Sequence, residues 1–322
     1  MPKPLFFGFY VKYVGIILFI GFLVFFALAS SYAFASATNI RSLLKLIPEF
    51  SIVAIGVGVL MIAGEIDLSV SSTIPICGYV FSLLFVAGVN VILIVSAVLS
   101  LGLFIGLLNG LVTVKGRIPS FITTLGSMML LRGILYAHSG MLTIAMRRYL
   151  VNEPLLVRLF IGEVAGVPVQ FLWLTLFALM LGIVLHFHRF GCWIYATGGN
   201  KEAARAMGIK TDMVKTICFM LVGFLCAFSA IMQIIRVEAF HVVLGNLYEL
   251  QAIAACVMGG ASLFGGIGGL PGFVWGSAII PMIQNGIVFL PIPAAGTTAF
   301  VGIVIVFFAL LNTFIERKII RK

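Results

Sequence analysis

The sequence predicts an all-α polytopic membrane protein with about ten transmembrane helices. Hydrophobic residues make up 62% of the 322 residues and charged residues only 9%, too few to cover a soluble protein of this length. The apolar runs are continuous, whereas the strands of a β-barrel would alternate polar and apolar residues. One membrane helix needs about 20 apolar residues, so ten helices use roughly 200 residues. The residues that remain suffice for loops but not for a large soluble domain. We therefore treat residues 1–322 as a single transmembrane domain.

The spans follow from the apolar runs in order along the chain. Lys3 and Lys12 precede the first run, as in a signal peptide, but this run is long enough for an uncleaved helix. The stretches Leu68–Val114 and Leu250–Ile315 contain no Asp, Glu, Lys or Arg and hold two and three spans. The predicted spans are 13–35, 48–63, 70–87, 91–114, 119–137, 168–188, 216–235, 250–260, 272–290 and 295–314.

The second and eighth of these spans are short, and we expect partial or tilted helices there. A glycine-interrupted segment follows each of them. Such paired interruptions are typical of two halves related as an inverted repeat.

The orientation follows from the basic residues. The formal net charge is +10, which in a soluble protein would raise the question of nucleic acid. Here the basic residues instead mark the cytoplasmic side, and no nucleic-acid partner is expected. With the N-terminus inside, most Lys and Arg residues fall on the inner side, and an even number of spans places both termini in the cytoplasm. An external loop then covers residues 138–167, and a cytoplasmic loop covers residues 189–215.

The sequence offers no set of residues for catalysis or metal binding. The five cysteines form no CxxC pair, and the four histidines have no metal-ligand spacing. The chain also lacks paired aspartates and a Ser-His-Asp arrangement. We therefore predict no catalytic residues, no metal site and no intramembrane enzyme.

The cytoplasmic loop contains the clearest local signal. Asn200 is a good helix N-cap, Glu202 suits the first turn of a helix, and Gly208 suits its end. The alanines between them favour helix, so the sequence predicts a short capped helix over residues 201–207. Such a helix could seat in the groove of a cytoplasmic partner, or it could be an ordinary interfacial turn.

Four segments in order along the chain resemble the permease subunits of ABC importers of the ribose/monosaccharide type. The run Gly-Gly-Asn-x-x-Ala-Ala-x-x-x-Gly-Ile at 198–209 resembles their cytoplasmic coupling loop. The other three segments are 64–70 (Gly-Glu-Ile-Asp-Leu-Ser-Val), Asn109-Gly110 with 117–126, and 248–255 with 259–266 (Gly-Gly-Ala-Ser-Leu-Phe-Gly-Gly). Together they cover the second to the ninth predicted span.

The resemblance implies a bacterial inner-membrane subunit with ten spans, built as two inverted repeats after a first helix. It implies import of a sugar or similar small polar solute along a path shared with a second permease subunit, in a homo- or heterodimer. It also implies an extracytoplasmic solute-binding protein and a separate ATPase subunit that uses ATP-Mg, with no cofactor in this chain. The residues implied to contact the ATPase are Gly199, Asn200, Glu202, Ala203, Ala204, Arg205 and Gly208.

Two acidic residues beside a helix break need a separate explanation. Glu65 and Asp67 follow the second span, where an acid in the hydrocarbon core costs roughly 2.5–3.5 kcal/mol on insertion scales. In one interpretation they flank the translocation path or a gate; in another, Asp67 is the N-cap of the third span. A third is that they couple an ion gradient in a stand-alone secondary transporter. The candidate path residues are Glu65, Asp67, Ser69, Asn109 and Asn285.

The glycine-rich run Gly259–Gly272 does not fit a nucleotide site. Glycine-rich loops can bind phosphate, but no Lys-Ser/Thr pair follows, as a Walker A sequence requires. We expect this run to serve close helix packing or a turn between two spans.

Overall fold

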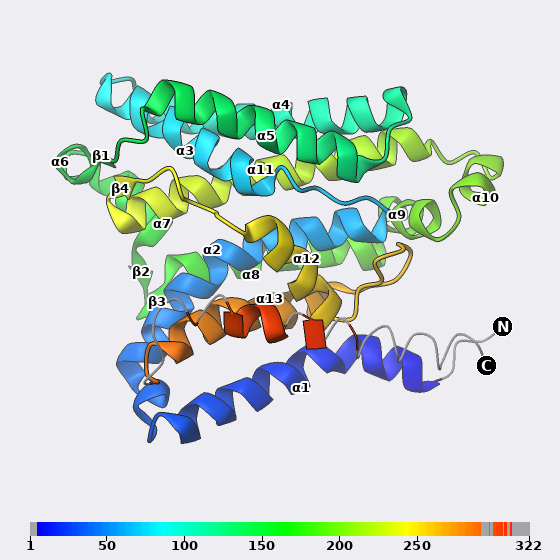
Figure 1. Cartoon of the computed structure of the whole chain (residues 1–322), viewed down its shortest axis with the longest axis horizontal. Coiled ribbons are helices and arrows are strands. Elements are labelled where there is room, and N and C mark those ends of the chain that lie inside the picture. Colours follow the sequence, from blue (N-terminus) through cyan, green and yellow to red (C-terminus); the bar gives the residue numbers. More distant parts are fainter. Residues whose placement is uncertain (1–4, 291–295, 297–298, 305, 308–309, 311–322) are drawn as a thin grey trace.

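The computed structural model describes residues 5–290, 296, 299–304, 306–307 and 310. Its long helices lie side by side along one common direction, with short loops at the two ends of the bundle (Figure 1). The long helices are α1 (Leu5–Ala29), α2 (Ala37–Ile62), α3 (Val70–Val86), α4 (Val91–Gly116), α5 (Ser120–Ser139), α8 (Val169–Phe187), α11 (Thr211–Val237) and α13 (Leu270–Ile287).

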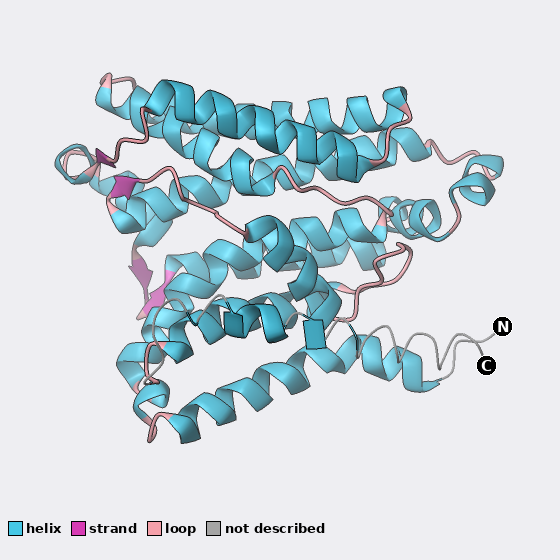
Figure 2. Cartoon of the chain, in the orientation of Figure 1, coloured by secondary structure: helices cyan, strands magenta, loops and turns pink. Residues whose placement is uncertain are grey.

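Shorter elements connect the long helices. They are the 3-10 turn η1 (Ala33–Ala35) and the helices α6 (Arg147–Leu150), α7 (Pro154–Ile161), α9 (Arg189–Gly199), α10 (Lys201–Ala206) and α12 (Tyr248–Met258). Strand β1 (Ile144–Ala145) pairs antiparallel with β4 (Ala239–Phe240), with Ile144 opposite Phe240. Strand β2 (Glu163–Val164) pairs antiparallel with β3 (Val167–Pro168). Both small sheets lie at the end of the bundle opposite α10 (Figure 2).

The structure confirms an all-α polytopic membrane protein. Within the described residues, five helices are long and apolar enough to cross a membrane: α2, α4, α5, α8 and α11. Shorter apolar helices are the 14–29 part of α1, α3 and α12. The predicted span 295–314 and the basic C-terminal end fall mostly outside the described residues.

The structure corrects the predicted start of the second span. Helix α2 begins at Ala37, not at residue 48, and has 26 residues, so it is neither short nor partial. The sequence misleads here because Pro48 and nearby charges interrupt the apolar run. Pro48 lies inside the helix, and Glu49 forms an ion pair with Arg236 of α11. By contrast, α12 is short, as predicted.

Helices α2 and α11 form the buried centre of the bundle. In each, 78% of the most apolar window is buried, against 28% for α4 and α8. Helices α4 and α11 approach so closely that a Cβ at Gly102 or Gly106 would overlap a carbonyl oxygen of Gly223 or Phe219. This backbone contact is the small-residue packing common between membrane helices, and it fixes α11 against α4.

Candidate coupling site and buried polar network

The predicted helix in the cytoplasmic loop is present as α10. The Oδ1 atom of Asn200 accepts a hydrogen bond from the Ala203 amide at 3.0 Å, so Asn200 is the N-cap as predicted. The helix ends before Gly208, whose φ of +85° favours glycine. Helix α10 lies at the extreme end of the bundle, next to α9 (Figure 1). It is a short exposed helix with a defined orientation.

One face of α10 is buried and the other is open. Ala204 is 1% exposed and packs inward, whereas Glu202, Ala203 and Met207 are exposed. Met207 is 71% exposed although it is apolar. The sequence analysis did not single out Met207, and the signal that could have found it is its place at the end of the alanine run. The open face therefore offers one acidic and one large apolar side chain to a partner.

Arg205 holds α10 against α11. Its Nη2 atom lies 2.5 Å from Asp212 Oδ1, and its Nε atom donates to Thr211 Oγ1 at 2.9 Å. Lys201 reaches the same carboxylate at 3.6 Å. Arg205 and Lys201 thus join the coupling loop to the start of α11, which fixes the angle at which α10 is presented.

The end of α9 meets two other parts of the backbone. The Gly266 amide donates to the Ile62 carbonyl oxygen at 2.9 Å, and Gly198 lies so close that a Cβ there would overlap the same oxygen. The Tyr195 hydroxyl donates to the Gly268 carbonyl at 2.9 Å, and burial raises the pKa of Tyr195, so the phenol stays protonated as a donor. The glycine-rich run therefore serves close packing, as the sequence predicted.

The break between α2 and α3 is a non-helical segment, 63–69, anchored by side chains of α5. The Ile66 amide donates to Ser120 Oγ at 3.1 Å, and the Leu68 amide donates to Thr124 Oγ1 at 3.0 Å. These bonds satisfy backbone groups that the interrupted helix leaves without partners.

Three of the candidate path residues lie together in this segment and its surroundings. Asp67 Oδ1 accepts from the Ser69 amide at 2.8 Å and from the Ser69 hydroxyl at 2.6 Å, and Asn109 donates to that hydroxyl at 2.8 Å. All three residues are at most 3% exposed. Ser69, not Asp67, occupies the N-cap position of α3. Asp67 instead closes a turn just before the helix.

The other two candidates lie apart from this chain of hydrogen bonds. Glu65 forms an ion pair with Lys215 near the start of α11, and both side chains are largely buried. Lys215 lies at the end of the predicted cytoplasmic loop 189–215, and nothing in the sequence indicated its pairing with Glu65. Asn285 lies in the last turn of α13, next to Gly286, which packs on the Phe26 ring of α1. In the described part of the chain its Oδ1 has no hydrogen-bond partner.

A second buried ion pair, missed by the sequence analysis, joins α2 and α11. Arg236 binds Glu49 with both arms, Nε to Oε1 at 2.5 Å and Nη2 to Oε2 at 2.9 Å. Ser229 donates to the Glu49 carbonyl at 2.6 Å, and Gln233 donates to Ser229 at 2.8 Å. The signal in the sequence that could have indicated this pair is the position of Glu49 and Arg236 at the borders of two apolar runs, where a charge needs a partner. Glu49–Arg236 ties α2 to α11, and Glu65–Lys215 ties the segment after α2 to the same helix.

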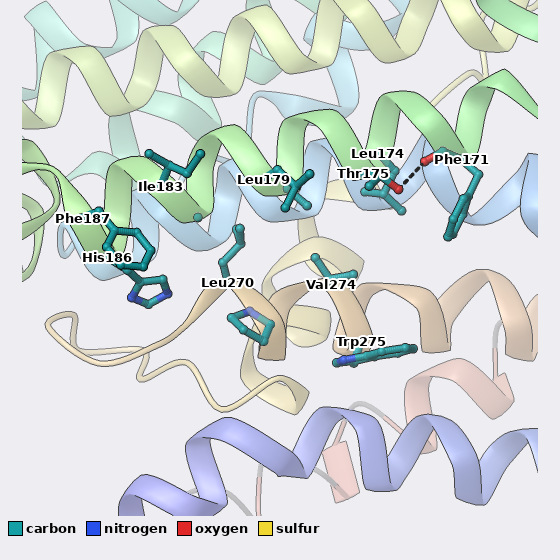
Figure 3. Close-up of a pocket in the computed structure, with 13 residues that line it drawn as sticks. Phe171, Leu174, Thr175, Leu179, Ile183, His186, Phe187, Leu270, Val274 and Trp275 are labelled. Atoms are coloured by element: carbon teal, nitrogen blue, oxygen red, sulfur yellow. Dashed lines mark hydrogen bonds between the residues drawn. The ribbon is translucent and has the colours of Figure 1, made fainter.

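An apolar cleft of about 420 Å³ lies between α8 and α13 (Figure 3). Its walls include Leu174, Leu179, Leu270 and Trp275, and its Thr175 hydroxyl is bound to the Phe171 carbonyl at 2.8 Å. A sugar requires several polar partners, which this lining does not supply. Among the described residues, no group of three or more His, Cys, Asp or Glu side chains could hold a metal ion.

Comparisons with known proteins match most of the chain. A family profile described as the permease component of a branched-chain amino acid transport system matches residues 39–309. Ribose import permease protein RbsC of Escherichia coli K12 is 34% identical over 270 residues, which cover 83% of this chain and 84% of that protein. Xylose/arabinose import permease protein XylH of Sulfolobus acidocaldarius is 34% identical over 293 residues, covering 88% and 80%. No solved structure gives a significant match.

Proposed function

The chain belongs to the family of branched-chain amino acid transport system permease components, and from this premise we propose that it is the membrane subunit of an ATP-driven importer of a sugar or similar small polar solute. The ribose and xylose/arabinose import permeases among its relatives support the solute class. ATP hydrolysis then belongs to a separate ATPase subunit, and this chain is not itself an enzyme.

The observation that carries the proposal is the capped, exposed helix α10. An ATPase on the cytoplasmic side needs a defined protrusion to push against, and α10 is fixed by Asn200 at its start and by Arg205 at its side. In this proposal Glu202, Ala203 and Met207 contact the ATPase. Gly199, Asn200, Ala204 and Gly208 shape the helix, and Arg205 sets its orientation.

The remaining parts of the proposal concern topology and partners. We propose ten spans, two inverted repeats after α1 and both termini in the cytoplasm of a bacterial cell. The start of α1 at the same end of the bundle as α10 supports the inner position of the N-terminus (Figure 1). A second permease subunit would complete the translocation path, and a solute-binding protein would deliver the solute to the end that carries the small sheets.

The buried chain Asp67–Ser69–Asn109 is the best candidate for a gate in the path, and Glu65, paired with Lys215, is kept as a separate candidate. Asn285 is kept as a separate candidate. The alternative of an ion-coupled secondary transporter has less support, because Glu65 is paired with Lys215 and Asp67 is satisfied by Ser69. Carboxylates that already have internal partners are poorly suited to binding a transported ion.

A charge reversal on the open face of α10 tests the proposed docking. Glu202→Arg should weaken binding of the ATPase encoded beside this chain by on the order of tenfold, since central contacts are worth more than 1 kcal/mol. Thermal unfolding of the isolated subunit should not change, because Glu202 is exposed. Glu153→Arg, before α7 at the other end of the bundle, is the matched control and should bind the ATPase normally. Equal binding by both variants would remove Glu202 from the contact.

A further inference from the structure

Three backbone segments meet at one point beside the coupling helix. They come from the end of α2, the end of α9 and the loop between α12 and α13. We call this contact the glycine junction; its members are Ile62, Gly64, Gly198, Gly199, Gly265 and Gly266.

The junction is made by backbone atoms with almost no side chains between them. A Cβ at Gly198 would overlap the Ile62 carbonyl oxygen, one at Gly265 would lie 2.8 Å from the Gly64 Cα, and one at Gly266 would lie 2.7 Å from the Gly199 Cα. The Gly266 amide also donates to the Ile62 carbonyl at 2.9 Å. At Gly198, Gly265 and Gly266 these distances leave no space for a residue other than glycine.

The junction is directly connected to α10. Helix α9 ends at Gly199, and α10 begins at Lys201, so only Asn200 separates them. Asn200 is itself held by its N-cap bond to Ala203. Contacts through side chains can absorb a small displacement by changing rotamer, whereas a backbone-to-backbone contact cannot. A shift of the end of α9 would therefore act directly on the end of α2, with no side chain between them to absorb it.

A second connection leads to the same place. Arg205 ties α10 to Asp212 at the start of α11, and Lys215, further along α11, binds Glu65. Both routes end in the segment 63–69. That segment is in turn bonded to Ser120 and Thr124.

We propose that the glycine junction is the element that transmits movement of the coupling helix to the non-helical segment 63–69 and the start of α5. Gly198 is a positioning residue in this device: it contacts neither the ATPase nor the solute. The inference rests on the proposed function, since it needs an ATPase that moves α10.

The test compares one close-packed glycine with one open glycine. Gly198→Ala adds a methyl group at the junction, and Gly21→Ala adds the same group in α1, where nothing lies within 4 Å. Each variant is reconstituted with its ATPase and solute-binding protein in proteoliposomes. ATP hydrolysis and uptake of radiolabelled ribose and xylose are measured together, with ATPase binding as a check of assembly.

Gly198→Ala should hydrolyse ATP within about twofold of the unmodified complex, while the solute imported per ATP falls at least fivefold. Gly21→Ala should keep the unmodified ratio. An unchanged ratio in an assembled Gly198→Ala complex overturns the inference and leaves the proposed function intact. Uptake by the unmodified complex that does not require ATP or the ATPase overturns both.

A second variant covers the case in which Gly198→Ala fails to assemble. Tyr195→Phe removes only the hydroxyl that holds the junction loop through Gly268. It should bind the ATPase normally and import about two- to threefold less solute per ATP. An unmodified ratio in Tyr195→Phe, with Gly198→Ala unable to assemble, assigns the junction to folding alone and overturns the inference.

Discussion

The ion pair between Glu49 and Arg236 allows a quantitative prediction about the centre of the bundle. Glu49 is 2% exposed and binds both arms of the guanidinium, whereas the Arg236 side chain is 30% exposed. Removing one partner of a fully buried pair typically costs about 3–5 kcal/mol, because the other charge is left uncompensated. Arg236 can still reach water, so Glu49→Leu should destabilise the protein by about 2–3 kcal/mol.

Replacement of the other partner, Arg236, and a double variant complete the measurement. Arg236→Met strands the more buried carboxylate and should cost about 3–4 kcal/mol. The double variant Glu49→Leu/Arg236→Met leaves no unpaired charge and should recover at least about 1 kcal/mol relative to the sum of the single variants. The assay is unfolding in mixed micelles with a rising fraction of denaturing detergent, followed by circular dichroism. Single effects below about 0.5 kcal/mol, or strict additivity, would refute the assignment of this pair as a buried tie between α2 and α11.

Two further predictions concern the packing of α4 and the turn at Asp67. Gly102→Val should lower the free energy of unfolding by about 3 kcal/mol or more in the same assay, because the valine side chain would overlap the Gly223 backbone. Gly126→Val, on the open face of α5, is the control and should change the free energy of unfolding by no more than about 0.5 kcal/mol. Equal effects would show that the close contact is not needed. Asp67→Asn keeps an acceptor for Ser69, so its free energy of unfolding should stay within about 1 kcal/mol and most of the uptake should remain. Asp67→Ala removes the acceptor, so it should lower the free energy of unfolding by about 1–3 kcal/mol and abolish most of the uptake. Loss of uptake in a stable Asp67→Asn variant would contradict the turn-forming role and indicate that the charge itself is used.

Local features were predictable from the sequence because their causes are local. The N-cap at Asn200 and the end of α10 just before Gly208 depend on residues within a few positions of each other, and both are confirmed. The start of α2 was predicted wrongly for the opposite reason: the residues that neutralise its charges are distant in sequence. Arg236 lies 187 positions after Glu49, and no local sequence pattern indicates that these two residues pair.

The candidate site was predictable in part. The segment containing Asp67 and Ser69 was expected to be a helix break, and Asn109 was a candidate path residue, but their hydrogen bonds depend on how α3 and α4 pack. Close packing of the glycine-rich run was also expected. That its partners are Gly198 and the end of α2 follows only from the three-dimensional arrangement.

We expect this chain to import a solute only when an ATPase moves the coupling helix. The direct test is uptake of radiolabelled ribose and xylose by proteoliposomes that contain this chain, the ATPase and solute-binding protein encoded beside it, with and without ATP-Mg. We expect uptake that requires ATP-Mg and the ATPase and that is lost when the ATPase cannot hydrolyse ATP. Uptake that persists without the ATPase, driven by an ion gradient alone, would contradict the account.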